Sequence, residues 1–422
     1  MMRKSILRKY AAFLALLLIS AMAISCDASV QMIVPSVTAP NLYGETAPPA
    51  EVETADGEVP GGADGEAAET QPEIKLPPDA RVSFLACGDN IIHSNVYEDA
   101  LDRGGGTEYK FISMYDDVAD IIAAADLAYV NQEGPMGGEK YGYSGYPTFN
   151  GPQEMGDALV DLGFNIVNIA NNHMFDKWES GFLDTAAYWK TKEVTLIGAY
   201  LDKDDYDDIR VVEKNGIKIA LLSYTYGTNG MVLNKGSSTV IPLIVEEDIR
   251  RQCRIAREKA DFVICSIHWG NEDWFKPSAH QLDFKDVMVE CGVDVIVGTH
   301  PHVLQPIVWE ENKEGHKTLV IYSLGNFIST MLYSRNMVGG MMTFDIVRKN
   351  GVITVENPLL HPIVCYYNRS RRGLQVYKME NFPAELAASH GSQKYGAFDL
   401  NSLKRYVTGT IDSAFLPDYL KS

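Results

Sequence analysis

The sequence offers little cysteine or serine chemistry. Five cysteines follow Cys26, an odd number without a CxxC pair, and Cys87 and Cys265 lie inside apolar, strand-like runs. They are predicted to be core residues without an obligatory disulfide, although one incidental bridge stays open. No GxSxG sequence occurs either. Nucleophilic catalysis by serine or cysteine therefore has little support.

Positive charge is also scarce, with 37 Lys+Arg against 56 Asp+Glu and a formal net charge of -19. Residues 27–77 are rich in Pro, Ala, Gly, Thr and Glu, and Lys75 is their single basic side chain. Such a segment buries too little apolar surface to offset its ordering entropy, so it is predicted to be a disordered tether. The acidic balance argues against nucleic acid or an anionic surface as a partner.

Long apolar runs are limited to one, AAFLALLLISAMAIS at residues 11–25. It follows a basic start and ends in the small residues before Cys26. This order predicts a secretory signal peptide over residues 1–26. A cysteine directly after small residues resembles a bacterial lipobox, so we expect lipidation of Cys26 and an extracytoplasmic, membrane-attached chain. The alternative is an uncleaved anchor followed by an ordinary cysteine.

The remaining residues, 78–422, are predicted to form an α/β domain. From Val82 onward, apolar strand-like runs alternate with helical patterns, which implies crossover connections and sheets covered on their faces. The Asn-Gly steps at residues 215–216 and 350–351 each predict a hairpin. Antiparallel pairs therefore accompany the parallel strands, and a second sheet is expected.

Carboxylate, amide and imidazole side chains follow the ends of five predicted strands. They are Asp89 after VSFLAC, Glu133 after LAYV, Asn172, His173 and Asp176 after IVNIA, His268 after FVICSI, and His300 and His302 after VDVIVG. Ligand sites of open α/β sheets gather at the carboxyl ends of strands, so these groups are expected to converge. They are the ligands of divalent transition metals, and two such ions about 3.5 to 4 Å apart stabilise displacement at phosphorus.

Each of these residues also has an ordinary structural interpretation. A Gly-Asp step after a strand is usually a turn, and a lone His268 is more often a hydrogen-bonded histidine than a ligand. His300-Pro301-His302 is the hardest to explain this way, because two adjacent exposed imidazoles bring little stability. The proline stiffens the turn and holds both side chains towards one pocket. Four other histidines do not fit the pattern and are predicted to be structural or solvated, namely His280, His316, His361 and His390.

Six motifs in order resemble those of CapA-type proteins of capsule and poly-γ-glutamate biosynthesis, relatives of the calcineurin-like metallophosphoesterases. They lie between about Val82 and Ile328 and read CGDNII, DLAYVNQEGP, GFNIVNIANNHMFDKWESG, VICSIHWGNE, VIVGTHPHVLQPI and VIYSLGNFI. The resemblance implies a four-layer α/β/β/α sandwich with mixed sheets and two divalent metal ions, Mn, Fe or Zn. It also implies a membrane-attached role in making, exporting or anchoring an anionic polymer. A C-terminal extension from about residue 358 carries no motif.

The resemblance also assigns roles by position. Glu133 takes the place of the bridging carboxylate, His173 that of the general acid, and Asn326 a place near substrate oxygens. The implied metal ligands are Asp89, Glu133, Asn172, His268, His300 and His302. The first motif departs from the usual Asp-x-His, because Asn90 and Ile91 follow Asp89 and the nearest histidine is His93. Either His93 reaches into the site, or it is a loop histidine.

Two functions follow from this sequence. The first is a metal-dependent hydrolase or transferase acting on a phosphoester or a polymer linkage, with His173 protonating the leaving group. The alternative is a non-catalytic, metal-stabilised scaffold or polymer-binding lipoprotein that works with capsule synthesis or export proteins. The incomplete first motif and the long tether favour the alternative. Metal content and turnover of an aryl phosphate together separate the two.

Overall fold

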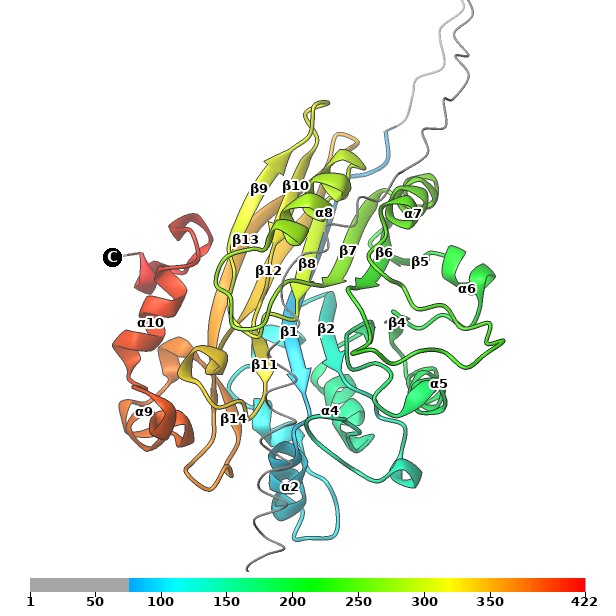
Figure 1. Cartoon of the computed structure of the whole chain (residues 1–422). Helices are drawn as coiled ribbons and strands as arrows, with labels where there is room; N and C mark the ends of the chain where they lie inside the picture. The colour runs from blue at the N-terminus through cyan, green and yellow to red at the C-terminus, as the bar shows by residue number, and fades with distance from the viewer. Residues whose placement is uncertain (1–75, 422) are drawn as a thin grey trace, which may run out of the picture. The chain divides into compact units, whose positions relative to one another are not determined.

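Two mixed β-sheets form the centre of the region that the computed structural model describes, residues 76–421 (Figure 1). The predicted signal peptide and almost all of the predicted tether lie outside these residues. The first sheet has the order β14-β13-β12-β1-β2-β3-β4, with β11 paired to β1. Its strands are β1 (Ala80–Ile91), β2 (Leu127–Glu133), β3 (Ile166–Asn168), β4 (Thr195–Ile197), β11 (Asn326–Ile328), β12 (Val338–Lys349), β13 (Val352–Tyr366) and β14 (Gln375–Lys378).

The second sheet has the order β5-β6-β7-β8-β10-β9. Its strands are β5 (Arg210–Lys214), β6 (Ile217–Thr225), β7 (Phe262–His268), β8 (Val295–Thr299), β9 (Ile307–Glu311) and β10 (Lys317–Ile321). Strands β1 to β4 run parallel to one another, and so do β6, β7, β8 and β10. Within each sheet the carboxyl ends of these parallel strands therefore meet at one edge.

Both predicted hairpins are confirmed. The residue pair 215–216 joins β5 to β6, and the pair 350–351 joins β12 to β13, with antiparallel pairing in each case. All four turn residues have positive φ, 51° and 75° in the first turn and 51° and 79° in the second. A two-residue turn with positive φ at both positions matches the right-handed twist of the strands, and asparagine and glycine tolerate that conformation best.

Side-chain alternation in the second sheet shows that it lies between two layers. In β6, Ile219 and Leu221 join the core shared with the first sheet, whereas Ala220 and Leu222 face a separate cluster. That second cluster contains Ile249 of α7 and apolar residues of α8, so these helices cover the outer face. Helices α4 and α5 pack against the first sheet, on the β2 to β4 side in Figure 1. The predicted four-layer sandwich is therefore confirmed.

The helices of the described region are mostly short. They are α2 (Ser94–Arg103), α3 (Ala119–Ala123), α4 (Glu154–Leu162), α5 (Trp178–Trp189), α6 (Lys203–Asp207), α7 (Glu246–Lys259), α8 (Ala279–Glu290), α9 (Ala384–Ser389) and α10 (Leu400–Thr408). Between residues 76 and 421, no helix has the length and apolar character that crossing a membrane requires. The five cysteines of this region are free thiols, and all but the half-buried Cys291 are buried.

The C-terminal part of the chain is built into the first sheet. The predicted boundary near residue 358 falls inside β13, which continues to Tyr366 and pairs with β14. His390 is buried, lies with Nε2 3.0 Å from the carbonyl of Cys365, and stacks on Phe398 at 3.8 Å between ring centroids. These contacts attach the final helices to the sheet, as Figure 1 shows on the side of α9 and α10.

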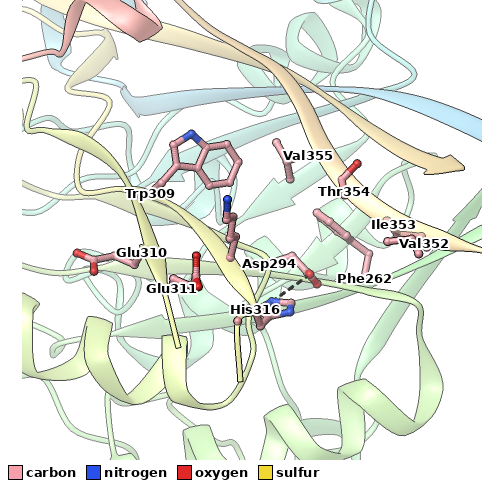
Figure 2. A pocket seen from close by; sticks show the side chains of 12 residues that line it. Phe262, Asp294, Trp309, Glu310, Glu311, His316, Val352, Ile353, Thr354 and Val355 are labelled. Carbon is pink, nitrogen blue, oxygen red and sulfur yellow. Dashed lines mark ion pairs between the residues drawn. The ribbon is translucent and has the colours of Figure 1, made fainter. Parts of the chain in front are cut away.

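A pocket of about 720 Å³ opens at the amino ends of β7, β8 and β10 (Figure 2). Its lining includes Phe262, Trp309 and Val352, together with Asp294 and His316. The two titratable groups face each other, with His316 Nε2 3.3 Å from Asp294 Oδ1. Because the predicted site residues follow the opposite ends of the same strands, this pocket is separate from them.

Candidate metal centre

The predicted site residues lie at the carboxyl edges of both sheets. The first sheet supplies Asp89 in β1, Glu133 at the end of β2 and the residues after β3, and the second supplies His268 at the end of β7 and the loop after β8. The hydroxyls of Tyr129 and Ser266 form a hydrogen bond between the sheets beside this edge, at 2.6 Å between the oxygens. The site is thus assembled across the seam between two sheets.

Asp89, Glu133 and His302 form a first group whose ligand atoms all lie within 4.8 Å of one another. His302 Nδ1 is 3.1 Å from Asp89 Oδ2 and 3.0 Å from the side-chain oxygen of Asn326. Its Nε2 is 3.7 Å from Glu133 Oε1. All three side chains of the group are buried. Two carboxylates and one imidazole in this arrangement are the ligands expected for a divalent cation.

Glu272, His300 and His302 form a second group, whose ligand atoms also all lie within 4.8 Å of one another. His302 belongs to both groups, so the two candidate positions share one imidazole. Glu272 is exposed and was not among the predicted site residues. The available signal was its place in HWGNE, four residues after His268 and beyond the end of β7.

The turn that carries the two histidines has an uncommon backbone. His300 has a φ of 98° and His302 a φ of 56°, a region that residues other than glycine seldom adopt. The carbonyl of Pro301 between them accepts a hydrogen bond from the backbone N–H of Asp273 at 2.9 Å. Backbone strain of this kind persists only where the surroundings enforce it, and it gathers at functional sites. The strained turn is what directs both rings into one place.

His268 and Asn172 form a third element beside these groups. His268 Nε2 is 3.0 Å from Asn172 Oδ1, and its Nδ1 is 2.9 Å from the hydroxyl of Thr299. The His268 ring centroid lies 4.8 Å from that of His300, which in turn lies 4.6 Å from Tyr226. The structure therefore brings His268 and Asn172 next to the two groups.

His173 stands apart from both groups and pairs with Asp176. Its Nδ1 is 2.7 Å from Asp176 Oδ2, which also accepts the backbone N–H of Phe149 at 2.7 Å. The Phe149 ring meets the imidazole edge to face at 4.7 Å between centroids. A carboxylate that accepts the Nδ1 proton fixes the tautomer and leaves Nε2 as the atom that gives or takes a proton. This arrangement suits a general acid or base.

A chain of buried hydrogen bonds orients Asp89. Its Oδ1 accepts a bond from the side-chain amide of Asn131 at 2.8 Å, and Asn131 Oδ1 accepts one from Asn168 at 2.8 Å. Asn168 Oδ1 accepts a bond from the hydroxyl of Ser223 in the second sheet at 2.5 Å. Partners of this kind hold a ligating carboxylate in one orientation. Sequence reasoning missed both asparagines, although Asn131 directly follows the predicted strand LAYV and Asn168 lies within the predicted strand IVNIA.

Burial and mutual charge shift the titration of the groups at this edge. Burial lowers the pKa of His268 and His300 well below the ordinary value and raises that of Glu133 well above it. For His302, burial opposes the charge, but Glu133 and Asp89 outweigh it and raise the pKa to about 10. A divalent cation held here would favour the ionised form of Glu133, against the burial that raises its pKa.

Two unpartnered atoms test whether the residues present suit a cation. Glu133 Oε2 and His300 Nδ1 are buried and have no hydrogen-bond partner among the described residues. A buried acceptor without a partner costs about 1–3 kcal/mol, so it is retained where it has another use. Both atoms belong to the groups defined above, and the donor set therefore fits a divalent metal.

His93 does not complete either group. Its Nδ1 is 3.3 Å from the backbone N–H of Thr330 and acts as the acceptor of that bond. The neutral ring then carries its proton on Nε2, which makes this atom a donor instead of a metal ligand. Asn90 is the middle residue of the first motif, and its side-chain oxygen accepts a bond from Tyr115 at 2.8 Å. Ile91 occupies the histidine position of Asp-x-His, and His93 belongs to neither ligand group.

Comparison with known proteins bears on the identity of this site. The family model described as "Bacterial capsule synthesis protein PGA_cap" matches residues 83–331, more than half of the chain. The chain belongs to the PGA_cap family. Both groups, the His173 pair and Asn326 lie inside the matched residues, and the C-terminal region from residue 332 lies outside them.

Two relatives of the PGA_cap chain are named CapA. Capsule biosynthesis protein CapA of Bacillus anthracis is 32% identical over 208 residues, which cover 48% of this chain and 49% of that protein. PGA biosynthesis protein CapA of Bacillus subtilis is 30% identical over 288 residues, covering 67% and 72%. The match thus spans about half the length of the B. anthracis protein and 72% of the length of the B. subtilis protein.

Solved structures show more distant likenesses. A phosphatase from Mycoplasma pneumoniae has 15% identity and a TM-score of 0.44, covering 69% of this chain and 95% of its own. The sulfate thiohydrolase SoxB of Thermus thermophilus has 13% identity and a TM-score of 0.38, covering 78% and 61%. With TM-scores this low, neither likeness bears on the activity of the PGA_cap chain.

One buried carboxylate holds the loop of residues 226–245, which borders the site. Glu179 of α5 accepts hydrogen bonds from the backbone N–H of Asn234 at 3.0 Å and from the hydroxyl of Thr239 at 3.1 Å. The hydroxyl of Ser237 donates a third. These bonds, above all that of Ser237, lower the pKa of Glu179. One ionised side chain, that of Glu179, therefore anchors the loop that begins with Tyr226, whose ring lies beside His300.

Replacing this carboxylate, Glu179→Gln, is expected to lower the free energy of unfolding by about 1–3 kcal/mol at neutral pH. A carboxyl group with a depressed folded-state pKa stabilises the fold above its unfolded pKa of 4.5, and the stabilisation is lost as the pH falls through the lower folded value. The difference between variant and wild type should therefore shrink below pH 4.5. Urea denaturation measures it, with the exposed Glu258→Gln as control. Equal stability at neutral pH contradicts the anchoring role.

Proposed function

We propose that this PGA_cap protein is a metal-dependent hydrolase or transferase that acts on a phosphoester or on a linkage of an anionic capsule polymer. The observation that carries the proposal is the pair of ligand groups that share His302, with buried unpartnered atoms on Glu133 and His300. The choice of a capsule polymer as substrate is based on the names of the two Bacillus relatives. The proposal places the chain outside the cytoplasmic membrane, attached through Cys26, and rests there on the sequence of residues 1–26 alone.

Metal binding falls to the residues of the two groups. Asp89 and Glu133 would bind from the first sheet, and His300 and His302 from the second, with Glu272 at the solvent side and His268 and Asn172 adjacent. When bound there, divalent cations would polarise a phosphoryl or carbonyl oxygen and lower the pKa of a water molecule. The Asn131 chain keeps Asp89 in its ligating orientation.

Proton transfer falls to His173. Asp176 holds the ring by Nδ1, so Nε2 is the atom that protonates the leaving group. Phe149 packs edge to face against this ring. Because His173 is in neither ligand group, binding of the metal and transfer of the proton are assigned to different residues.

The test combines metal analysis of the purified full chain with turnover of an aryl phosphate. Two equivalents of Mn, Fe or Zn together with turnover that a chelator abolishes and the metal restores are expected. A folded chain that takes up none of these metals and turns over nothing sinks the proposal. Metal without turnover supports the second candidate, a non-catalytic scaffold. Ile91 stands where the first motif usually has its histidine, and this departure favours that candidate.

A further inference from the structure

Two cysteines and three arginines line a small pocket in the helical layer that covers the second sheet. The pocket has a volume of about 300 Å³, and its lining residues are Arg250, Cys253, Arg254, Arg257 and Cys291. Four of them belong to α7, and Cys291 directly follows the last residue of α8. Neither the two ligand groups nor the pocket of Figure 2 includes any of these side chains. The pocket is therefore a separate feature of the molecule.

The two cysteines lie together where α7 packs against α8. Cys253 is buried in the apolar cluster beneath the two helices, and Cys291 packs against the same cluster while staying only half-buried. The other three cysteines of residues 76–421 are buried in the strands β1, β7 and β13. Within this region, Cys291 is thus the thiol that solvent reaches, and it has a second thiol behind it.

Arg250 holds a positive charge beside the Cys291 sulfur. Its Nη1 is 3.8 Å from Cys291 Sγ, while its Nε and Nη2 bond Glu246 and Glu290, each at 2.8 Å. Because these carboxylates belong to α7 and α8, they fix the guanidinium across both helices. A hydrogen bond from the Cys253 thiol, and after it the charge of Arg250, lower the pKa of Cys291 against the effect of burial. A thiol that nearby groups stabilise as the thiolate is a nucleophile.

Arg254 adds an unpaired charge to the same pocket. It is exposed, and it makes no hydrogen bond or ion pair within the part of the chain that the structure describes. Arg257, by contrast, bonds Asp294 Oδ2 at 2.6 Å. An exposed guanidinium attracts carboxylates and repels ammonium groups. The pocket therefore favours an anionic reagent over a cationic one.

We infer that Cys253 and Cys291 form a reactive dithiol, which reduces a small disulfide that carries carboxylates and is itself left as a bridge between α7 and α8. This inference goes beyond the proposed function, since it uses no residue of the metal centre. It also assigns a pair to the single bridge that the cysteine count leaves open. The segment that the bridge closes contains β7, the strand that ends in His268.

The reaction takes place in two exchange steps. The Cys291 thiolate attacks one sulfur of the donor, whose S–S bond breaks to release one donor thiolate. Cys253 then loses its proton and attacks the Cys291 sulfur, which releases the second donor thiolate. The protons given up by the two cysteines end on the two donor thiols. Two protein thiols are thereby oxidised, and one donor disulfide is reduced.

The experiment treats the reduced, purified full chain with oxidised glutathione and maps every cysteine by alkylation and peptide mass spectrometry. The wild type is expected to yield a bridge between Cys253 and Cys291. Cys253→Ala should stop at a glutathione adduct on Cys291, because the thiol that resolves the adduct is missing. Cys265→Ala is the matched control. It removes a buried thiol from the same apolar cluster and should form the bridge like the wild type.

The charge of the donor is tested with cystamine, a disulfide with two ammonium groups and no carboxylate. Arg254→Ala should slow bridging by oxidised glutathione about two- to fivefold, the usual weight of an exposed ion pair. The same variant should not slow bridging by cystamine. Equal slowing with both reagents, or no slowing with oxidised glutathione, overturns the anionic donor.

Three results of the wild-type map overturn the dithiol. They are a Cys291 that stays unmodified, a Cys291 that keeps the glutathione adduct, and modification of Cys87 or Cys365 as fast as that of Cys291. Because these outcomes come from the wild type, a variant that fails to fold does not prevent the test. Metal content and turnover of an aryl phosphate enter none of these measurements, so failure of the proposed function leaves the result for the dithiol intact.

Discussion

His302→Ala is expected to abolish both metal retention and turnover. The imidazole is common to the two ligand groups, with Nδ1 beside Asp89 and Nε2 facing Glu133, so one substitution disrupts both positions. Changes to residues that merely support a ligand cost about 10- to 100-fold in metal affinity or activity, and loss of a shared ligand should exceed that range. Metal content after gel filtration and turnover of an aryl phosphate are the two measurements.

His316→Ala is the matched control for this substitution. It removes an imidazole from the opposite end of the same sheet, where His316 faces Asp294 in the pocket of Figure 2. This variant should keep metal and turnover at wild-type levels. Retention of two metal equivalents by a folded His302→Ala chain would show that the shared position is not a ligand. Circular dichroism of both variants separates loss of metal from loss of the fold.

His173→Ala is expected to reduce turnover by about 10²- to 10⁴-fold while leaving the metal content unchanged. The reason is that His173 bonds Asp176 rather than any member of the ligand groups. Steady-state turnover with the metal content measured on the same sample checks both halves of the prediction. A variant that loses its metal as well would move His173 into the ligand set.

Asp176→Asn supplies the control for the proposed role of His173. The amide can still bond the ring and the backbone N–H of Phe149, but it no longer favours the same tautomer. Turnover should fall by less than in His173→Ala, and metal content should again stay constant. Undiminished turnover in His173→Ala would leave the leaving group to be protonated by another residue or by water.

The convergence of strand ends could be anticipated from sequence because parallel strands bring their carboxyl ends to one edge of a sheet. The positions of Asp89, Glu133 and His302 after apolar runs were visible without coordinates. The hairpins were equally accessible, since Asn-Gly is among the few pairs that tolerate positive φ at both positions. These features depend on local chemistry and one general rule of sheet geometry.

Other parts of the site depend on contacts that no local pattern encodes. Glu272 reaches His300 and His302 from a loop. It is exposed and belongs to no hydrophobic pattern, so the sequence does not distinguish it from other surface carboxylates. Asn131 and Asn168 support Asp89 through hydrogen bonds between neighbouring strands, and a sequence does not show which strands are neighbours. The division of ligands into two groups with one shared imidazole likewise required the three-dimensional arrangement.

The ligand groups draw on both halves of the sandwich, and this has a thermodynamic consequence. Asp89 and Glu133 belong to one sheet, whereas His300 and His302 follow a strand of the other. An ion held by Asp89, Glu133 and His302 would act as a cross-link between the layers, in addition to the buried core that joins them. Its binding energy then adds to the resistance of the layers to separation, in proportion to the logarithm of ion concentration over its dissociation constant. The stability of the folded chain would then follow the supply of the metal.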